Sequence, residues 1–280
     1  MLHYSHLHRQ RAVDGFALIA ALLLAAPLTA QVDLGLAPMR VEFPAVPGRA
    51  FSGTLALSNG PVKTRIRTEL LDLYIDETTT PQFVANAPAE APYSCRSWLS
   101  VNPMEMDLDG RTEVPVRFTV RVPPSASQGS FHCAIGFRSL PGEGEAAGPQ
   151  MRTAVRMIAA IYPIVGKPPI SGVIKGLKLE QVADGAAVLW RAVVIMENTG
   201  MMLYRPIGDL ELVDADGKVV ESQKLAPFPV LPKREQRFVS PLKAALAPGN
   251  YTLRARIDVG AEIQEASAAV TAESASQPAK

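Results

Sequence analysis

Apolar and polar residues alternate along most of the chain after its first 30 residues. In the clearest run, residues 112–122, valine or phenylalanine occupies every even position from Val114 to Val122. Successive side chains of a β-strand point to opposite faces, so this run predicts a strand with one face in a core and the other in water. No window after residue 30 shows the apolar stripe of an amphipathic helix.

Short strand patterns of this kind recur at spacings of roughly 8 to 12 residues, with Pro and Gly turns between them. The pattern stops at residues 166–172, "GKPPISG", and then restarts. The sequence therefore predicts an all-β protein of two tandem immunoglobulin-like antiparallel β-sandwich domains, residues 31–166 and 167–271, followed by a disordered tail, residues 272–280. The alternative, one larger sandwich, would need long connections that the turn spacing does not show.

The N-terminal 30 residues have the features of an export signal. Arg9 and Arg11 precede an apolar run from Phe16 to Ala30 that ends in small residues. The run is shorter than the ~20 residues that a membrane-spanning helix needs, which predicts a cleaved signal peptide over residues 1–30. An uncleaved membrane anchor is the alternative. No later segment is long and apolar enough to span a membrane, so we expect a periplasmic or extracellular protein without a membrane span after signal cleavage.

The charge balance argues against some classes of partner. The full chain has a net charge of +1, and removal of the predicted signal peptide takes away Arg9, Arg11 and Asp14, which leaves equal numbers of basic and acidic residues. Nucleic acids and anionic lipids bind surfaces with a basic excess, because such surfaces displace counterions. The sequence therefore predicts no nucleic-acid partner.

The two cysteines are expected to form a disulfide. On a strand, Cys133 shares one face with Phe131 and Ile135, whereas its neighbour His132 points the other way, which rules out a thiolate–imidazolium pair between them. In an oxidising compartment the natural partner of Cys133 is the only other cysteine, Cys95. Closing a loop of about 40 residues would stabilise the fold by about 4 kcal/mol. Two free buried thiols or one reactive thiol are the alternatives.

Little in the sequence suggests an enzyme. No "GxSxG" motif is present, and His132 is the only histidine after residue 30. A zinc site needs three or four ligands that the chain does not group together. The segment around Asp214 and Asp216 resembles a calcium loop, but Leu212 breaks the ligand spacing, and an Asp-Gly pair between apolar runs is typical of a hairpin turn. We therefore predict no catalysis, no metal and no cofactor.

One predicted strand, residues 154–165 ("AVRMIAAIYPIV"), has two apolar faces. One face carries Val155, Met157 and Ile161, and the other carries Ile158, Ala160 and Tyr162. A strand of this kind must be covered on both sides. The cover could be the second domain, or it could be another protein that pairs along the strand.

The segments "APMRVEF", "LALSNG", "WLSVNPMEMDLDGRTEVPVRFTVRVPPSASQGSF" and "AVRMIAAIYPIV" follow one another over residues 34–165. In this order they resemble the first domain of the PapD-like periplasmic pilus chaperones, which carry a second immunoglobulin-like domain behind it. Those chaperones lend apolar residues of their seventh strand to a pilin, and anchor the pilin's C-terminal carboxylate with an Arg of the first strand and a Lys of the seventh. Arg40 matches the Arg, whereas Ala159 occupies the Lys position.

The resemblance implies that Arg40, Val155, Met157 and Ile161 bind an exported protein partner, such as a pilin-like subunit or another envelope protein. Two hypotheses follow. The chain is a non-enzymatic chaperone-like protein that pairs an apolar edge strand with that partner, or it is a structural or adhesive immunoglobulin-like module of the cell envelope. In the second case the apolar strand only seats the neighbouring domain.

Overall fold

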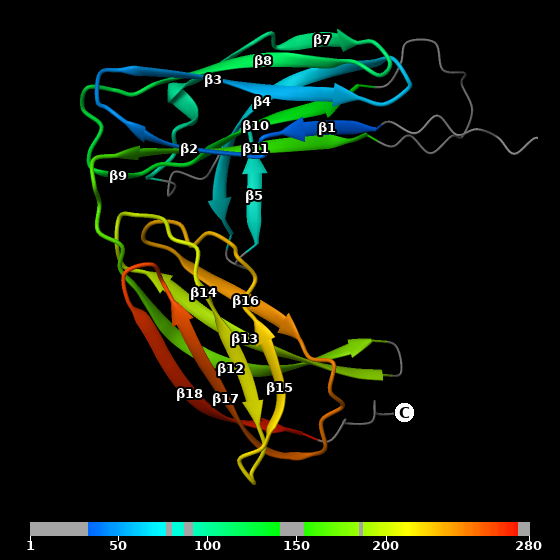
Figure 1. Cartoon of the computed structure of the whole chain (residues 1–280), viewed down its shortest axis with the longest axis vertical. Helices are drawn as coiled ribbons and strands as arrows, with labels where there is room; N and C mark the ends of the chain where they lie inside the picture. The colour runs from blue at the N-terminus through cyan, green and yellow to red at the C-terminus, as the bar shows by residue number, and fades with distance from the viewer. Residues whose placement is uncertain (1–32, 77–79, 87–91, 141–153, 185–186, 274–280) are drawn as a thin grey trace, which may run out of the picture.

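The computed structural model describes residues 33–76, 80–86, 92–140, 154–184 and 187–273. Figure 1 shows two β-sandwiches, one above the other, each built from one half of the chain. The predicted all-β fold of two tandem sandwiches is therefore confirmed. The predicted signal peptide, residues 1–30, lies outside the described residues. So does most of the predicted tail, of which residue 272 is still the last residue of a strand.

The first sandwich consists of a four-stranded and a seven-stranded sheet. The four-stranded sheet contains, in spatial order, β1 (Leu34–Ala37), β3 (Ala50–Asn59), β8 (Glu113–Arg121) and β6 (Leu99–Asn102). The other sheet has the order β2 (Arg40–Ala45), β11 (Arg156–Val165), β10 (Cys133–Ser139), β4 (Thr64–Ile75) and β5 (Pro81–Val84), with β7 (Glu105–Leu108) on β4 and β9 (Gly129–Ser130) on β11.

The alternation of the sequence places the core of this sandwich. Val116, Phe118 and Val120 of β8 are buried, whereas Arg117 and Arg121 between them are exposed. Pairing is antiparallel in both sheets except between β2 and β11, which run parallel. The chain passes from one sheet to the other between β1 and β2. As a result, β2 lies beside β11, the last strand of the same sandwich.

The predicted disulfide is confirmed. Cys95 and Cys133 are joined, with an S–S distance of 2.01 Å and a Cα–Cα distance of 5.2 Å. Cys133 lies in the core together with Ile135 and Phe137, the face that the strand pattern predicts. Cys95 comes just before a short 3₁₀ turn, Arg96–Trp98, and its N–H donates to the carbonyl oxygen of His132 at 3.1 Å.

His132 differs from the expectation of a polar residue on a wet strand face. Only 4% of it is exposed, and Ala134 and Gly136 on the same face of the strand are buried as well. The reason is that this face is covered by other parts of the chain, including the second sandwich, which reaches the neighbouring Ser130.

The second sandwich has a three-stranded and a four-stranded sheet. Their orders are β12 (Gly172–Asp184), β13 (Ala187–Asn198), β16 (Glu235–Pro241), and β15 (Val219–Lys224), β14 (Ile207–Val213), β17 (Gly249–Asp258), β18 (Ile263–Ala272). The Asp-Gly hairpin turn is present between β14 and β15: Gly217 has φ +82°, and its N–H donates to the carbonyl oxygen of Asp214 at 3.1 Å.

The two sandwiches are joined by hydrogen bonds and by an apolar cluster. The Ser130 N–H donates to the carbonyl oxygen of Met201 at 2.8 Å, and the Leu203 N–H donates to the Ser130 hydroxyl at 2.7 Å. A cluster beside this contact combines side chains of both sandwiches: Leu73, Ile75 and Tyr162 from the first, and Leu203 and Leu231 from the second. The hairpin of β4 and β5 extends toward the second sandwich and carries part of this cluster (Figure 1).

Candidate partner-binding site

β11 has two covered faces, as its sequence predicts. On the core side, Ala159 and Ile161 are buried in the first sandwich, and Val155 and Met157 are half-buried against the same core. On the other side, Tyr162 is buried and Ala160 half-buried in the cluster between the two sandwiches. The second domain therefore covers part of one face of this strand, which is one of the two alternatives that the sequence left open.

The backbone of β11 is paired along most of its length on one side, by β10 and β9, and only in part on the other side. β10 pairs with residues Arg156 to Ile161, whereas β2 begins to pair only at Ala160. The Ala160 N–H donates to the carbonyl oxygen of Met39 at 3.0 Å, on the β2 side. Within the described part of the chain, no strand pairs with residues 156–159 on that side, and we call this segment the open edge of β11.

The polar groups of the open edge can be assigned from the alternation of a strand. Val155 exchanges hydrogen bonds with Ser139, next to β10: its N–H donates to the serine hydroxyl, and its carbonyl oxygen accepts from the Ser139 N–H, both at 2.9 Å. Backbone groups of successive residues point to opposite sides, so those of Met157 and Ala159 face β10 as well. The backbone groups of Arg156 and Ile158 therefore point out of the open edge.

Ile161 does not have the position that the partner-binding hypothesis requires. Its side chain is 0% exposed in the first core, and its backbone is opposite Val41 of β2. The hypothesis treated Val155, Met157 and Ile161 as one exposed face, and this is wrong for Ile161 because the parallel strand β2 and the facing sheet cover it. Val155 and Met157, beside the open edge, are half-buried and stay candidates.

Arg40 lies at the end of the open edge. It is the first residue of β2, opposite Ala160, and 58% of its side chain is exposed. Its Nε lies 3.8 Å from the carboxylate of Glu42, two residues further along β2. Ala159, at the position where the pilus chaperones carry a Lys, is fully buried in the core and contributes no charge.

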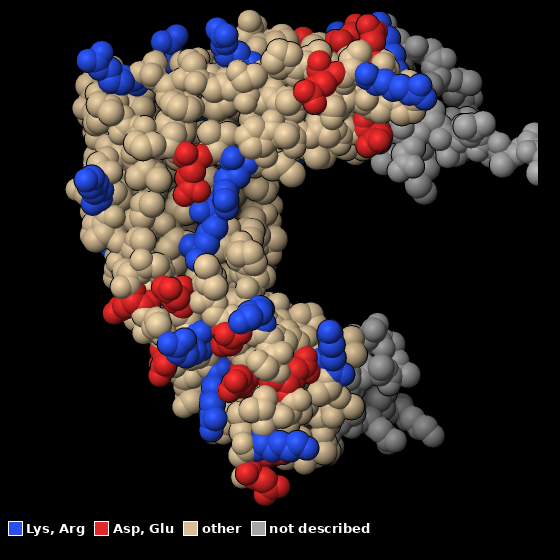
Figure 2. Space-filling model, in the orientation of Figure 1, with Lys and Arg blue, Asp and Glu red and all other residues tan. Residues whose placement is uncertain are grey.

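A pocket of about 330 Å³ opens beside Arg40, between the two sandwiches. It is lined from the first sandwich by Met39, Arg40, Leu73, Ile75, Phe83, Ile158, Ala160 and Tyr162, and from the second by Arg205, Pro227, Phe228, Pro229 and Leu231. The space-filling view in Figure 2 shows that the molecule is hollowed between its two halves. Ile158 belongs to both the pocket and the open edge, so they form one continuous candidate site.

Arg205 is the functional candidate that the sequence did not reveal. It lies between β13 and β14, and its Nη1 donates to Glu42 Oε1 and Oε2 at 3.3 and 3.1 Å. Its guanidinium carbon lies 5.2 Å from the centre of the Tyr162 ring, a cation–π contact. Burial raises the pKa of the Tyr162 hydroxyl, so this ring stays neutral. Arg205 has no periodic sequence pattern around it, and only the fold brings it to Arg40.

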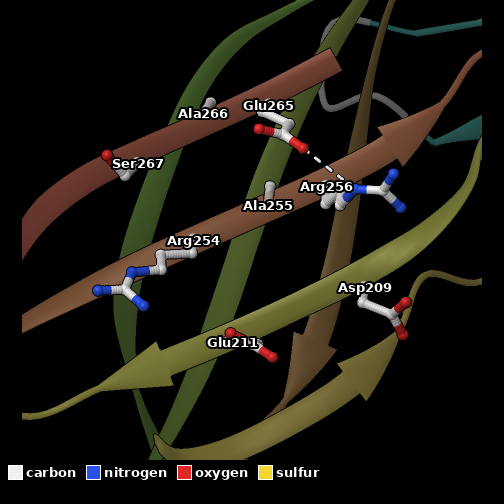
Figure 3. Close-up of a pocket in the computed structure, with 8 residues that line it drawn as sticks. All are labelled: Asp209, Glu211, Arg254, Ala255, Arg256, Glu265, Ala266 and Ser267. Atoms are coloured by element: carbon white, nitrogen blue, oxygen red, sulfur yellow. Dashed lines mark hydrogen bonds and ion pairs between the residues drawn. The ribbon is translucent and has the colours of Figure 1, made fainter. Parts of the chain in front are cut away.

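A second hollow, of about 530 Å³, lies on the outer face of the sheet of β14, β17 and β18 (Figure 3). Its charged side chains largely neutralise one another: Arg256 pairs with Glu265 at 3.0 Å, and Asp209 pairs with Lys224 at 2.7 Å. This face has the features of a solvated charge ladder across a sheet. It lies on the second sandwich only and shares no residue with the candidate site.

Two searches of the described residues concern other kinds of function. Within them, no group of three or more His, Cys, Asp or Glu side chains is placed to hold a metal ion. Within the same residues, no helix has the length and apolar character to cross a membrane.

Solved structures similar to this chain include several fimbrial chaperones. A chain from a chaperone–tip adhesin complex of CFA/I fimbriae biogenesis is 12% identical, with a TM-score of 0.46, and the match covers 85% of this chain and 98% of that one. The E. coli chaperone DraB is 16% identical (TM-score 0.41; 86% and 98% covered). A chain from the complex of the Salmonella enterica SafA pilin with the SafB chaperone is 14% identical (TM-score 0.43; 88% and 98% covered).

No family model and no curated protein matches this sequence. The structure itself has the two-sandwich arrangement that the resemblance of residues 34–165 to PapD-like chaperones implies, and β2 runs beside β11, the last strand of the first sandwich.

Proposed function

We propose that this protein is a non-enzymatic chaperone of the fimbrial type, which binds an exported partner by adding one of the partner's strands to the open edge of β11. The observation that carries the proposal is the open edge itself. Arg156 and Ile158 direct their N–H and C=O groups away from β10, with Val155 and Met157 half-buried beside them. Unpaired strand groups next to apolar surface are the features that strand addition uses.

The charges at the end of the edge favour one direction for the added strand. β11 runs from Arg156 toward Val165, so the open edge ends beside Arg40. A strand parallel to β11 would bring its C-terminal end to Arg40, whereas an antiparallel strand would bring its N-terminal end. A guanidinium group attracts a carboxylate and repels an ammonium group. We therefore infer a parallel partner strand whose C-terminal carboxylate lies near Arg40, as the pilus-chaperone resemblance implies.

The protein would bind its partner outside the cytoplasm, in the periplasm or at the cell surface. The disulfide between Cys95 and Cys133 supports this location, because such bonds persist in oxidising compartments. The partner would be a pilin-like subunit or another envelope protein.

The alternative function, a structural or adhesive module, is favoured by one observation. The outward face of β11 is already covered by the protein's own second sandwich, through Tyr162 and Leu203. The part of this face around Tyr162 therefore requires no other protein for its burial, whereas Ile158 on the same face lines the open pocket.

Substitutions at Ile158 separate the two functions. Ile158→Pro removes an N–H that faces the open edge and leaves the β10 pairing in place, whereas the matched control Ile158→Ala shortens the same side chain and keeps the N–H. Both tagged variants and the natural protein are used to capture proteins from an envelope extract. The captured protein is identified by mass spectrometry, purified and titrated back. We expect at least a tenfold loss of affinity for the Pro variant relative to the Ala variant. Equal affinities would favour the structural module.

A further inference from the structure

β18 is the last strand of the four-stranded sheet in the second sandwich, and one of its two sides is unpaired (Figure 1). It pairs with β17 over its ten residues without a bulge, and no strand among the described residues pairs with its other side. β12, an edge strand of the facing sheet, lies next to β18, but within the described residues the two share no backbone hydrogen bond. Every residue from Ile263 to Thr271 is at least partly exposed, so this side of β18, which we call its free edge, reaches water.

The backbone groups of the free edge can be assigned from the turn that precedes β18. The Val259 N–H donates to the carbonyl oxygen of Glu262 at 3.1 Å, directly beside the first strand pair, Asp258 with Ile263. Opposite residues of an antiparallel pair alternate between bonded and non-bonded pairs, so every second residue of β18 points its N–H and C=O groups away from β17. These residues are Ile263, Glu265, Ser267, Ala269 and Thr271.

The free edge lacks the features that keep strand edges from pairing with other chains. Proteins protect such edges by making them short, by placing Pro or Lys on them, or by a bulge. β18 has ten residues, no Pro, no Lys or Arg and no bulge. Its one charged residue is Glu265, which Arg256 of β17 neutralises at 3.0 Å.

The other edge strands of the described structure each have at least one protective feature. β12 has a bulge between Ile174 and Gly176 and carries lysines. β15 carries Lys224, and the side chain of its Glu221 accepts hydrogen bonds from the N–H groups after β16. β2 and β16 contain Pro44 and Pro241, and β1, β5, β6, β7 and β9 have at most four residues each. The free edge of β18 is therefore an exception within the molecule.

We propose that β18 pairs in antiparallel fashion with β18 of a second copy of this chain, so that two four-stranded sheets become one continuous sheet. Two identical strands form such a pair about a two-fold axis, and each copy uses the same surface. With Ser267 at the axis, Glu265 lies opposite Ala269 of the partner subunit, so no like charges meet. On the other face of the strand, Ala266 and Ala268 lie opposite one another, and these small side chains leave room for close approach. About ten hydrogen bonds would join the two edges.

This inference does not depend on the proposed function. The free edge of β18 belongs to the second sandwich, whereas the open edge of β11 belongs to the first. Each copy in the dimer would keep its own open edge for a partner.

Sedimentation velocity of the natural protein over a series of concentrations tests the dimer. The interface of one strand per copy is small compared with the ~800 Å² per partner of a standard stable complex, so we expect a reversible dimer that grows with concentration. Ser267→Pro removes an N–H from the centre of the free edge, and the matched control Ser267→Ala keeps it. The dissociation constant should be about tenfold higher or more for the Pro variant than for the Ala variant. A natural protein that stays monomeric, or equal constants for the two variants, would overturn the inference.

Charges at position 269 test the register of the pair. Ala269→Lys would place an ammonium group opposite Glu265 of the partner subunit, twice in each dimer, whereas Ala269→Glu would place a carboxylate there. Opposite charges across a strand pair stabilise it and like charges destabilise it. We expect the dissociation constant to fall about threefold or more for the Lys variant and to rise by a similar factor for the Glu variant. Equal constants would show that this register is wrong.

Two further measurements separate a lost dimer from a lost fold and from another occupant. Thermal unfolding shows whether Ser267→Pro has disturbed the second sandwich. If it has, Ser267→Lys takes its place, because it leaves the backbone intact and sets two ammonium groups against each other at the axis. Hydrogen exchange of the natural protein is followed at low and high concentration. The N–H groups of Glu265 and Ser267 should become protected only at high concentration, and protection in the monomer would mean that a segment of the same chain covers the edge and that the inference is wrong.

Discussion

The N–H of Ala160 donates to the carbonyl oxygen of Met39 at 3.0 Å, and this bond marks the point where the open edge of β11 ends. On one side of that point, β2 pairs with β11 as far as Val165. On the other side, no strand among the described residues pairs with the backbone groups of Arg156 and Ile158. One strand therefore serves in its second half as part of a closed sheet and in its first half as a free edge.

Amide hydrogen exchange should show this division residue by residue. In the isolated protein, we expect the N–H groups of Arg156 and Ile158 to exchange faster than those of Met157 and Ala159, which face β10. The N–H of Ala160 should again be protected. The measurement is a series of NMR spectra after transfer into D₂O. Equal protection of all five groups would mean that another segment covers the edge.

Aspartate substitutions should separate the core half of β11 from its edge half. Ile161→Asp places a charge in a fully buried position, so we expect it to lower the free energy of unfolding by about 4 kcal/mol or more. Met157→Asp should cost clearly less, because the half-buried Met157 lies beside the open edge, where a carboxylate can reach water. Urea unfolding of the two variants gives the comparison. Equal losses would show that Met157 is as deeply enclosed as Ile161.

The disulfide should contribute a large part of the stability of the first sandwich. Cys95 and Cys133 are 38 residues apart, and a loop of this length corresponds to about 4 kcal/mol in the chain-entropy treatment. Replacement of both by alanine should therefore shift the urea midpoint of the first sandwich strongly. A reducing agent should produce a similar shift in the natural protein and none in the double variant, which serves as the control. A double variant as stable as the natural protein would contradict this role.

His132 should make stability depend on pH. Burial, together with the nearby positive charge of Arg234 and against the opposing effect of Asp72, lowers the pKa of His132 to about 4. The unfolded chain takes up a proton near pH 6.5 and the folded chain only near pH 4. The stability contribution of neutral His132 is therefore complete above pH 6.5 and is lost as the pH falls toward 4.

Between pH 7 and pH 5 this loss amounts to about 2 kcal/mol. His132→Leu should remove this part of the pH dependence, whatever its effect on stability at pH 7. Urea unfolding at both pH values, followed by the fluorescence of Trp98, which packs on the neighbouring Phe131 with ring centres 4.4 Å apart, measures the difference. An unchanged pH dependence in the variant would assign the effect to carboxylates instead.

Strand alternation carried most of the information that the sequence held about the fold. It predicted the buried and exposed residues of β8 and placed Cys133 on the core face, which led to Cys95 as its partner. Both faces of β11 were also identified as covered. These features depend on neighbours along one strand, and a period of two residues is enough to recognise them.

The features that sequence reasoning missed depend on contacts between distant segments. Ile161 is buried because β2, more than a hundred residues earlier in the chain, pairs beside it in parallel. His132 is buried because its strand face is covered, and Arg205 reaches Glu42 from a loop of the other sandwich. Alternation along a strand says which residues share a face, but not what lies opposite that face.

The two covered faces of β11 also restrict how its length can change. An insertion of one residue near Met157 would rotate every preceding side chain to the opposite face, so that Val155 would leave the core and Arg156 would enter it. An insertion of two residues would keep both faces and would simply lengthen the open edge. Variation in this strand should therefore be tolerated in even steps only, and a pair of added residues would be the direct way to fit a longer partner segment.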